Sequence, residues 1–152
     1  MQVFERVGQD LTQALISFLD AHLKATGAPV DQHELPDAEQ LADLQKCFLE
    51  QQQQLWNSML LRKQGESPPP LVKAEPGDRR FSSSEWHASP VFDYIRQAYL
   101  LNSHFVRELV EIIPVGTDKA KNRTRFLARQ FIDALSPANF AATNPEFVRQ
   151  AL

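Results

Sequence analysis

The stretch SPVFDYIRQAYLLNSHFVRELVEIIP, residues 89–114, predicts one long helix that organises the second half of the chain. Ser89 followed by Pro90 suits a helix start, because a serine side chain caps free N–H groups and proline fits the first turn. Apolar residues recur every three or four positions, so they share one face. The predicted buried face consists of Val91, Ile95, Ala98, Leu101, Phe105, Leu109 and Ile112. Pro114 and Gly116 end the helix.

Further helices are predicted on both sides of this stretch. Upstream, Ser82 and Glu85 have the spacing of a capping box. Downstream, a strong helix is predicted over residues 118–135 and stops at a Ser-Pro pair. Pro145 opens a last helix, which places apolar residues at the very end of the chain, where termini are usually polar. We therefore expect the sequence to be cut short.

The first 64 residues predict two amphipathic helices, one ending before Pro29 and one starting after Pro36. Their apolar stripes are Phe4, Val7, Leu11, Ala14, Phe18, Ala21 and Ala25 in the first helix, and Leu41, Leu44, Phe48, Leu55, Trp56, Met59 and Leu60 in the second. Such helices are expected to pair as an antiparallel hairpin, although the same stripes suit a second copy or another partner. The four glutamines at 51–54 are expected on a solvated face.

Residues 65–77 are rich in proline, serine and charged side chains. This composition favours an extended, semi-rigid linker over a packed element. The predicted fold class is therefore all-α, with an amphipathic helical hairpin over residues 1–64, a Pro-rich linker over 65–77 and a small helical domain over 78–152.

Composition narrows the possible location and partners. The net charge of −3 argues against a nucleic-acid partner, which needs many unpaired lysines and arginines. The only cysteine, Cys47, cannot form an internal disulfide, which favours a reducing compartment. Charges interrupt the first twenty residues, so no signal peptide is expected, and no stretch suits a transmembrane segment. The predicted location is the cytoplasm.

The residues predict no catalytic, cofactor or metal site. Nucleophilic catalysis commonly uses a serine or cysteine on a sharp, glycine-flanked turn. Cys47 instead lies within a predicted helix and is expected to be a buried, small hydrophobic side chain. The histidines stand apart, so a zinc site is not expected, and the five glycines form no phosphate-binding loop. These histidines are His22, His33, His87 and His104.

Basic side chains form the strongest local charge pattern. Helical spacing places Lys121, Arg125 and Arg129 along one face, and Arg79 and Arg80 follow the linker. One interpretation is a solvated face or pairing with nearby carboxylates. The other is contact with an adjoining domain or an anionic partner such as a coenzyme A phosphate, because guanidinium groups fit phosphate oxygens.

A series of short motifs in the second half resembles one known family. The motifs are Asp78-Arg79-Arg80-Phe81, Trp86, Pro90, Tyr99-Leu100-Leu101, Arg123-Thr124-Arg125-Phe126, Arg129-Gln130, the stretch DALSPANF at 133–140 and TNPE at 143–146. Together they resemble the N-terminal region of polyhydroxyalkanoate synthases, class I enzymes in particular, over residues 78–152. Ala141 departs from the pattern, where a larger apolar residue is expected. Residues 1–64 match no motif.

The resemblance implies a function for a longer protein. Such enzymes polymerise 3-hydroxyacyl-coenzyme A into storage polyester through a cysteine nucleophile in a downstream α/β-hydrolase domain, which this sequence lacks. This part would support a homodimer, position the catalytic domain and attach to polymer granules or granule-coating proteins. A free-standing, phasin-like granule adaptor is the alternative, and a small nucleic-acid binder is a third.

Overall fold

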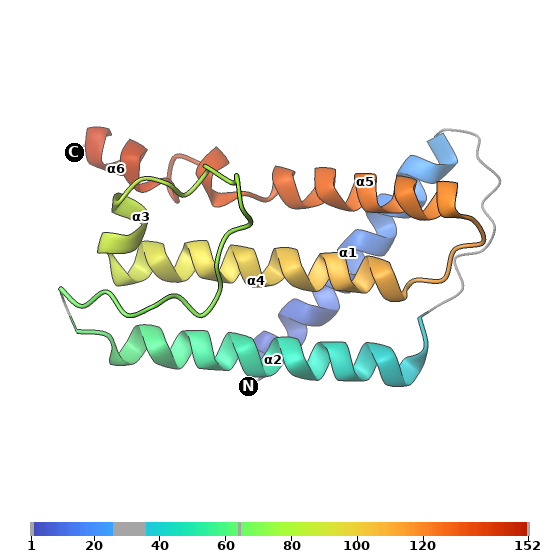
Figure 1. Cartoon of the computed structure of the whole chain (residues 1–152), viewed down its shortest axis with the longest axis horizontal. Coiled ribbons are helices and arrows are strands. Elements are labelled where there is room, and N and C mark those ends of the chain that lie inside the picture. The colour runs from blue at the N-terminus through green and yellow to red at the C-terminus, as the bar shows by residue number, and fades with distance from the viewer. Residues whose placement is uncertain (1, 26–35, 64, 152) are drawn as a thin grey trace.

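The computed structural model describes residues 2–25, 36–63 and 65–151, and these residues form helices and loops without a strand (Figure 1). The helices are α1 Gln2–Ala25, α2 Ala38–Leu61, α3 Glu85–Ala88, α4 Pro90–Ile112, α5 Asp118–Ala134 and α6 Pro145–Ala151, with a 3-10 turn, η1, at Pro137–Asn139. The predicted all-α fold class is confirmed. The expected helix end before Pro29 and the histidine His33 lie outside the described residues.

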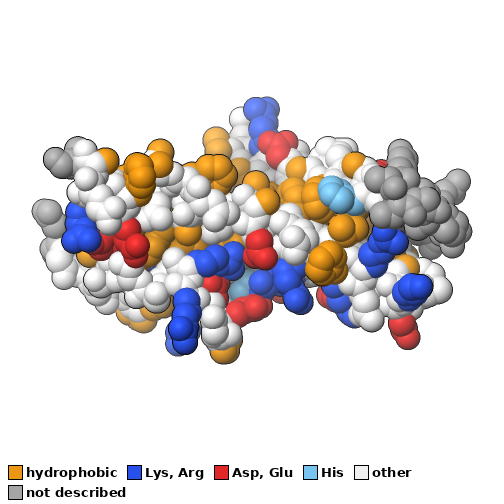
Figure 2. All heavy atoms as spheres, turned by 90° about the horizontal axis from the view of Figure 1, so that it is seen from above, with side chains coloured by type: hydrophobic (Ala, Val, Ile, Leu, Met, Phe, Trp, Pro, Cys, Tyr) orange, Lys and Arg blue, Asp and Glu red, His pale blue; other side chains and the backbone are white. Residues whose placement is uncertain are grey.

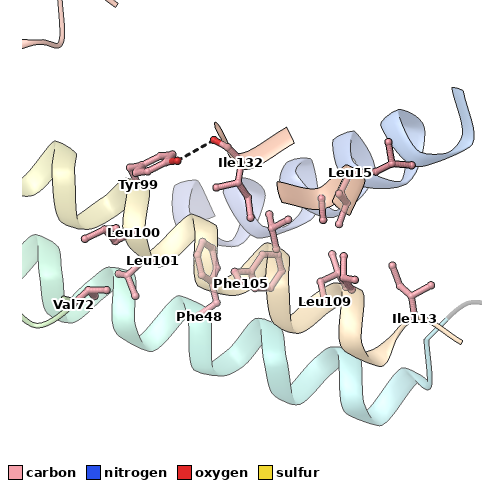
Figure 3. Packing of buried hydrophobic residues seen from close by; sticks show 14 of the residues in the cluster. Leu15, Phe48, Val72, Tyr99, Leu100, Leu101, Phe105, Leu109, Ile113 and Ile132 are labelled. Atoms are coloured by element: carbon pink, nitrogen blue, oxygen red, sulfur yellow. Dashed lines mark hydrogen bonds between the residues drawn. The ribbon is translucent and has the colours of Figure 1, made fainter. Parts of the chain in front are cut away.

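Helix α4 forms the centre of the fold. Figure 1 shows α2 and α5 on either side of α4, each antiparallel to it, with α1 crossing obliquely behind. Because α4 has several neighbours, its buried residues spread around the helix, as part of the core in Figure 3 shows. The buried apolar residues of α4 are Tyr99, Leu100, Leu101, Phe105, Val106, Leu109 and Val110. The predicted single face is incomplete, because Leu100, Val106 and Val110 are also buried, and it is wrong at Val91, which lies in the first turn of α4 and is exposed.

Helix α1 enters the core through a slightly different stripe from the predicted one. Leu15 and Leu19 are buried, whereas Ala14 and Ala21, assigned to the stripe by their spacing, are exposed. The helix turns its larger apolar side chains inward because they bury more area. A Cβ atom at Gly8 would lie 3.4 Å from the Phe48 ring, an ordinary van der Waals distance, so Gly8 lies directly against the Phe48 ring of α2. Helix α1 also contacts α4 and α5.

Helix α2 begins at Asp37, whose Oδ1 accepts hydrogen bonds from the backbone N–H groups of Glu39 and Gln40. Two sequence predictions on this helix are wrong. Three of the four glutamines at 51–54 are exposed as predicted, but Gln52 is buried, because its Nε2 donates to Oδ1 of Asn102 on α4 at 2.9 Å. Cys47 is exposed instead of buried, because the next residue along the helix, Phe48, occupies the core position.

Residues 65–77 form no helix or strand, but they pack against α4, whereas the sequence predicted a linker and not a packed element. Oε1 of Gln97 accepts hydrogen bonds from the backbone N–H groups of Leu71 and Val72, at 2.8 and 3.2 Å. The Val72 side chain is buried in the same cluster as residues of α1, α2, α4 and α5. The segment therefore crosses the fold as a strap held by one buried amide.

The starts of α3 and α4 agree only partly with the predicted caps. Ser89 occupies the cap position of α4 and Pro90 its first turn, but the Ser89 side chain makes no capping hydrogen bond. At α3 the cap position belongs to Ser84 and not to Ser82, because the helix is only one turn long and starts at Glu85.

Candidate interaction site

Arg80 lies at the centre of a polar cluster that joins the loop before α3 to α4 and α5. Its guanidinium donates to both carboxylate oxygens of Asp78, to Oδ1 of Asp133 at 3.0 Å and to the Tyr99 hydroxyl at 2.7 Å. The Tyr99 hydroxyl in turn donates to the Ile132 carbonyl oxygen at 3.0 Å (Figure 3). The hydrogen bond from Arg80 lowers the pKa of Asp78, while burial raises the pKa of Tyr99. The Arg80 guanidinium therefore already has hydrogen-bond partners within this chain.

Lys121 is also used internally. Its Nζ donates to the carbonyl oxygens of Val110, Glu111 and Ile113, at 2.7, 2.9 and 2.8 Å. These carbonyls belong to the C-terminal end of α4, where the helix leaves acceptors unpaired and where a cation is favoured. Partial burial lowers the pKa of Lys121. This lysine from α5 therefore caps α4.

Arg125 forms a surface ion pair. Its Nε and one terminal nitrogen donate to the two carboxylate oxygens of Glu111, each at 2.7 Å, and its other terminal nitrogen donates to Asn122. This two-point pairing lowers the pKa of Glu111. Both side chains are about half exposed, so the pair is accessible to solvent but its charge is already matched.

Arg79 and Arg129 are the remaining predicted cations. Both are exposed, and neither side chain makes a hydrogen bond or ion pair within the described part of the chain. Burial, then the charge of Arg129, lowers the pKa of Arg107, so these two cations lie near each other. Figure 2 shows basic and acidic side chains interspersed on this side of the molecule. The structure does not bring the five predicted residues into one basic site.

A second polar cluster, not anticipated from the sequence, is more deeply buried. Asp93 lies between Arg62, 3.0 Å away, and Arg96, 2.5 Å away, and both arginine side chains are 4% exposed. Gln97 donates to the same carboxylate, and Arg62 also donates to the His87 carbonyl oxygen at 2.7 Å. The i, i+3, i+4 spacing of Asp93, Arg96 and Gln97 is a sequence signal for contacts along one helix face. No such signal links Asp93 to Arg62, which lies far from it in the sequence.

An apolar groove lies where α1 diverges from α4 and α5. Its volume is about 270 Å³. Its walls include Leu11 of α1, Ile95 and Ala98 of α4, and Phe131 and Leu135 of α5. The oblique crossing of α1 explains the groove, because helices that diverge leave a wedge that side chains fill incompletely.

Other large apolar side chains of the described residues are partly exposed to solvent. The large apolar residues that are more than a third exposed are Val3, Trp56, Leu60, Leu61, Leu71, Val91, Phe126, Leu135, Phe140 and Phe147. Trp56 and Leu60 are four residues apart on α2, and the Phe4 ring lies 6.4 Å from the Trp56 ring. Several exposed aromatic rings in one small fold are typical of a protein that binds partners.

The described residues contain no cluster of three or more His, Cys, Asp or Glu side chains that could hold a metal ion. In the same part of the chain, each helix is too short or too polar to cross a lipid bilayer.

The described residues define an all-α region that is held together by an apolar core and buried ion pairs and that exposes several aromatic side chains. Residues 77–152 match the family described as the N-terminus of poly-beta-hydroxybutyrate polymerase (PhaC). The chain belongs to this family, as its sequence motifs predict.

Curated relatives carry the same family name and are much longer. A poly(3-hydroxyalkanoate) polymerase of Methylorubrum extorquens is 43% identical over 98 residues, which are 64% of this chain and 16% of the relative. The polymerase subunit PhaC of Rhizobium meliloti is 30% identical over 127 residues, 84% of this chain and 21% of the relative. That of Cupriavidus necator is 36% identical over 110 residues, 72% of this chain and 18% of the relative. No solved structure matches.

Proposed function

We propose that this chain is a noncatalytic part of a poly(3-hydroxyalkanoate) polymerase that supports dimerisation, positions the catalytic domain and attaches the enzyme to polymer granules in the cytoplasm. The observation that carries the proposal is the family match over residues 77–152, in a chain that spans only about a fifth of its relatives. In the whole enzyme, the polymerised substrate would be 3-hydroxyacyl-coenzyme A, and the cysteine nucleophile would lie in the downstream domain.

Exposed apolar side chains on α1 and α2 support a contact with polymer or with a second copy. Val3 is 71% exposed, and Trp56 and Leu60 share one face of α2. Apolar surface in water is unfavourable by about 25 cal/mol per Å², so burying these side chains at a polymer surface or in a dimer favours association. Arg79 and Arg129, whose charges are unpaired in the described residues, supply contacts for carboxylates of an adjoining domain or for an anionic partner.

The test compares the full-length polymerase with a variant that lacks residues 1–152. Coenzyme A release, mass in solution and the fraction that sediments with granules are measured for both. We expect the deletion to lower turnover, to change the mass and to release the enzyme from granules. Unchanged values for all three would overturn the proposal.

Two substitutions refine this test. Trp56→Ser combined with Leu60→Ser is expected to lower granule sedimentation or dimer mass at unchanged coenzyme A release per folded enzyme. Leu71→Ser is the control, because Leu71 is apolar, has an exposure between those of Trp56 and Leu60, and lies in the strap. If this 152-residue chain sediments with granules while its deletion leaves the turnover and granule sedimentation of the polymerase unchanged, the free-standing adaptor is favoured instead.

A further inference from the structure

The loop from Leu135 to Pro145 is unusually well fixed for a segment between helices. The Asn139 amide donates to the Asp133 carbonyl oxygen at 3.0 Å, and the Asn144 amide donates to that of Ala138 at 3.1 Å. The Thr143 hydroxyl donates to the Pro137 carbonyl oxygen at 2.7 Å. Each side chain replaces a backbone partner that a regular helix would supply. Three side chains therefore cross-link about ten residues of backbone.

This fixed loop holds its aromatic residue in solvent. Phe140 follows η1 and is 53% exposed, while Pro137 and Pro145 on either side are buried. A flexible loop could turn its phenylalanine inward, but the cross-linked backbone holds Phe140 outward. Phe147, in the first turns of α6, is 54% exposed. A backbone that is already fixed loses little conformational entropy when a partner binds. Apolar rings held by such a backbone therefore suit a preformed docking surface.

Helix α6 is tied to the same end of the molecule. Figure 1 shows α6 beside α3, and Nε of Arg149 donates to a carboxylate oxygen of Glu85 on α3 at 2.7 Å. Figure 2 shows apolar side chains exposed over this end. A helix of only seven residues is marginal in water, so α6 depends on the buried Pro145 and on its contacts with α3, including this ion pair, to hold its position.

We infer that Phe140 and Phe147 form a docking surface for the part of the polymerase that follows residue 152. This rests on the proposed function, since it names the surface through which the catalytic domain is positioned. Chain continuity favours this occupant, because the chain that follows residue 152 is tethered five residues after Phe147 and is therefore at a high effective concentration near this end of the molecule. The stretches shared with this chain are 16% and 21% of two relatives, so most of each relative lies outside the shared stretch. Exposed aromatic rings suit a protein partner, because aromatic side chains are enriched at protein interfaces.

Hydrogen exchange tests this surface in the full-length polymerase and in this chain alone. We expect the backbone N–H groups within residues 145–151, which all of these residues except Pro145 carry, to exchange at least tenfold more slowly in the full-length protein. Protection of other surfaces, with unchanged exchange at 145–151, would overturn this inference but not the proposed function. If no surface of residues 2–151 gains protection, both are overturned.

A longer α6 would also slow exchange without any docking, and a substitution outside α6 separates the two causes. Phe140→Ser in the full-length polymerase is expected to restore at least a tenfold faster exchange at 145–151. Leu71→Ser, with the same 53% exposure at a site outside this surface, is expected to leave it unchanged. Unchanged exchange in Phe140→Ser would overturn the inference. In the chain alone, Phe140→Ser should keep the wild-type unfolding midpoint, which confirms that the fold is intact.

Discussion

Asp93 is the most constrained single residue of the fold. Its carboxylate is the shared partner of Arg62 and Arg96, whose side chains are almost fully buried. Burying a charge without a partner is costly, so the cluster depends on this one anion. It joins the end of α2, the end of α3 and the first turn of α4.

Replacing Asp93 should therefore be among the most destabilising changes. Asp93→Ala leaves two buried guanidinium groups without their carboxylate, and we expect the free energy of unfolding to fall by about 3–5 kcal/mol. Urea denaturation followed by circular dichroism measures this. Arg125→Ala removes an exposed pair and should leave the midpoint unchanged. Equal midpoints for the two variants would contradict the buried cluster.

Asp78 makes stability depend on pH on the acid side. The hydrogen bond from Arg80 lowers the pKa of Asp78 below its ordinary value of 3.8. A carboxyl group with a depressed folded-state pKa contributes stability above its unfolded pKa, and that contribution is lost as pH falls through the folded pKa. We therefore expect Asp78→Asn to be less stable than the wild type near pH 6 and the difference to shrink below pH 4. Urea unfolding between pH 3 and 6 measures it, and a pH-independent difference would contradict the ion pair.

At the scale of elements, side chains of one element form hydrogen bonds with the free backbone groups of another. Lys121 on α5 supplies the cation and the donors that the C-terminal carbonyl groups of α4 lack. Gln97 on α4 supplies the acceptor that the strap needs at Leu71 and Val72. Helix periodicity predicts where such elements lie, but it carries no information about which distant side chain satisfies their free backbone groups.

The capping role of Lys121 differs measurably from an anion-binding role. Lys121→Met keeps the aliphatic stem but removes three hydrogen bonds, and we expect a loss of about 1–3 kcal/mol in the free energy of unfolding. Lys119→Met, on an exposed residue one turn or less away, is the control and should have little effect. Thermal unfolding monitored by circular dichroism distinguishes them. An unaltered midpoint for Lys121→Met would leave the lysine available for an anionic partner.

At the scale of the whole molecule, both halves of the chain contribute to one hydrophobic cluster. Leu15, Phe48 and Leu55 from the first two helices lie in the same cluster as Phe105 and Ile132. The Phe48 and Phe105 rings are 4.5 Å apart. A shared core makes the parts mutually dependent, which favours a single cooperative transition.

The two tryptophans allow this cooperativity to be measured, because Trp56 lies on α2 and Trp86 on α3. In Trp86→Phe and in Trp56→Phe, the remaining tryptophan reports on one half of the chain. We expect the fluorescence midpoint of each variant to coincide with its own circular dichroism midpoint in urea. Two separated transitions would show instead that residues 1–64 and 78–152 unfold independently.

The sequence by itself determined the helical fold class, the family and most helix positions, because apolar periodicity, prolines and capping residues act within a few residues of chain. It did not determine which side of α1 faces inward or that Cys47 is exposed. Nor did it determine that Arg80 and Lys121 form hydrogen bonds within the fold. Only the tertiary structure decided these features, because each depends on groups that are distant in the sequence and meet when the other helices pack against α4. Asp133 then contacts Arg80, and the C-terminal end of α4 contacts Lys121.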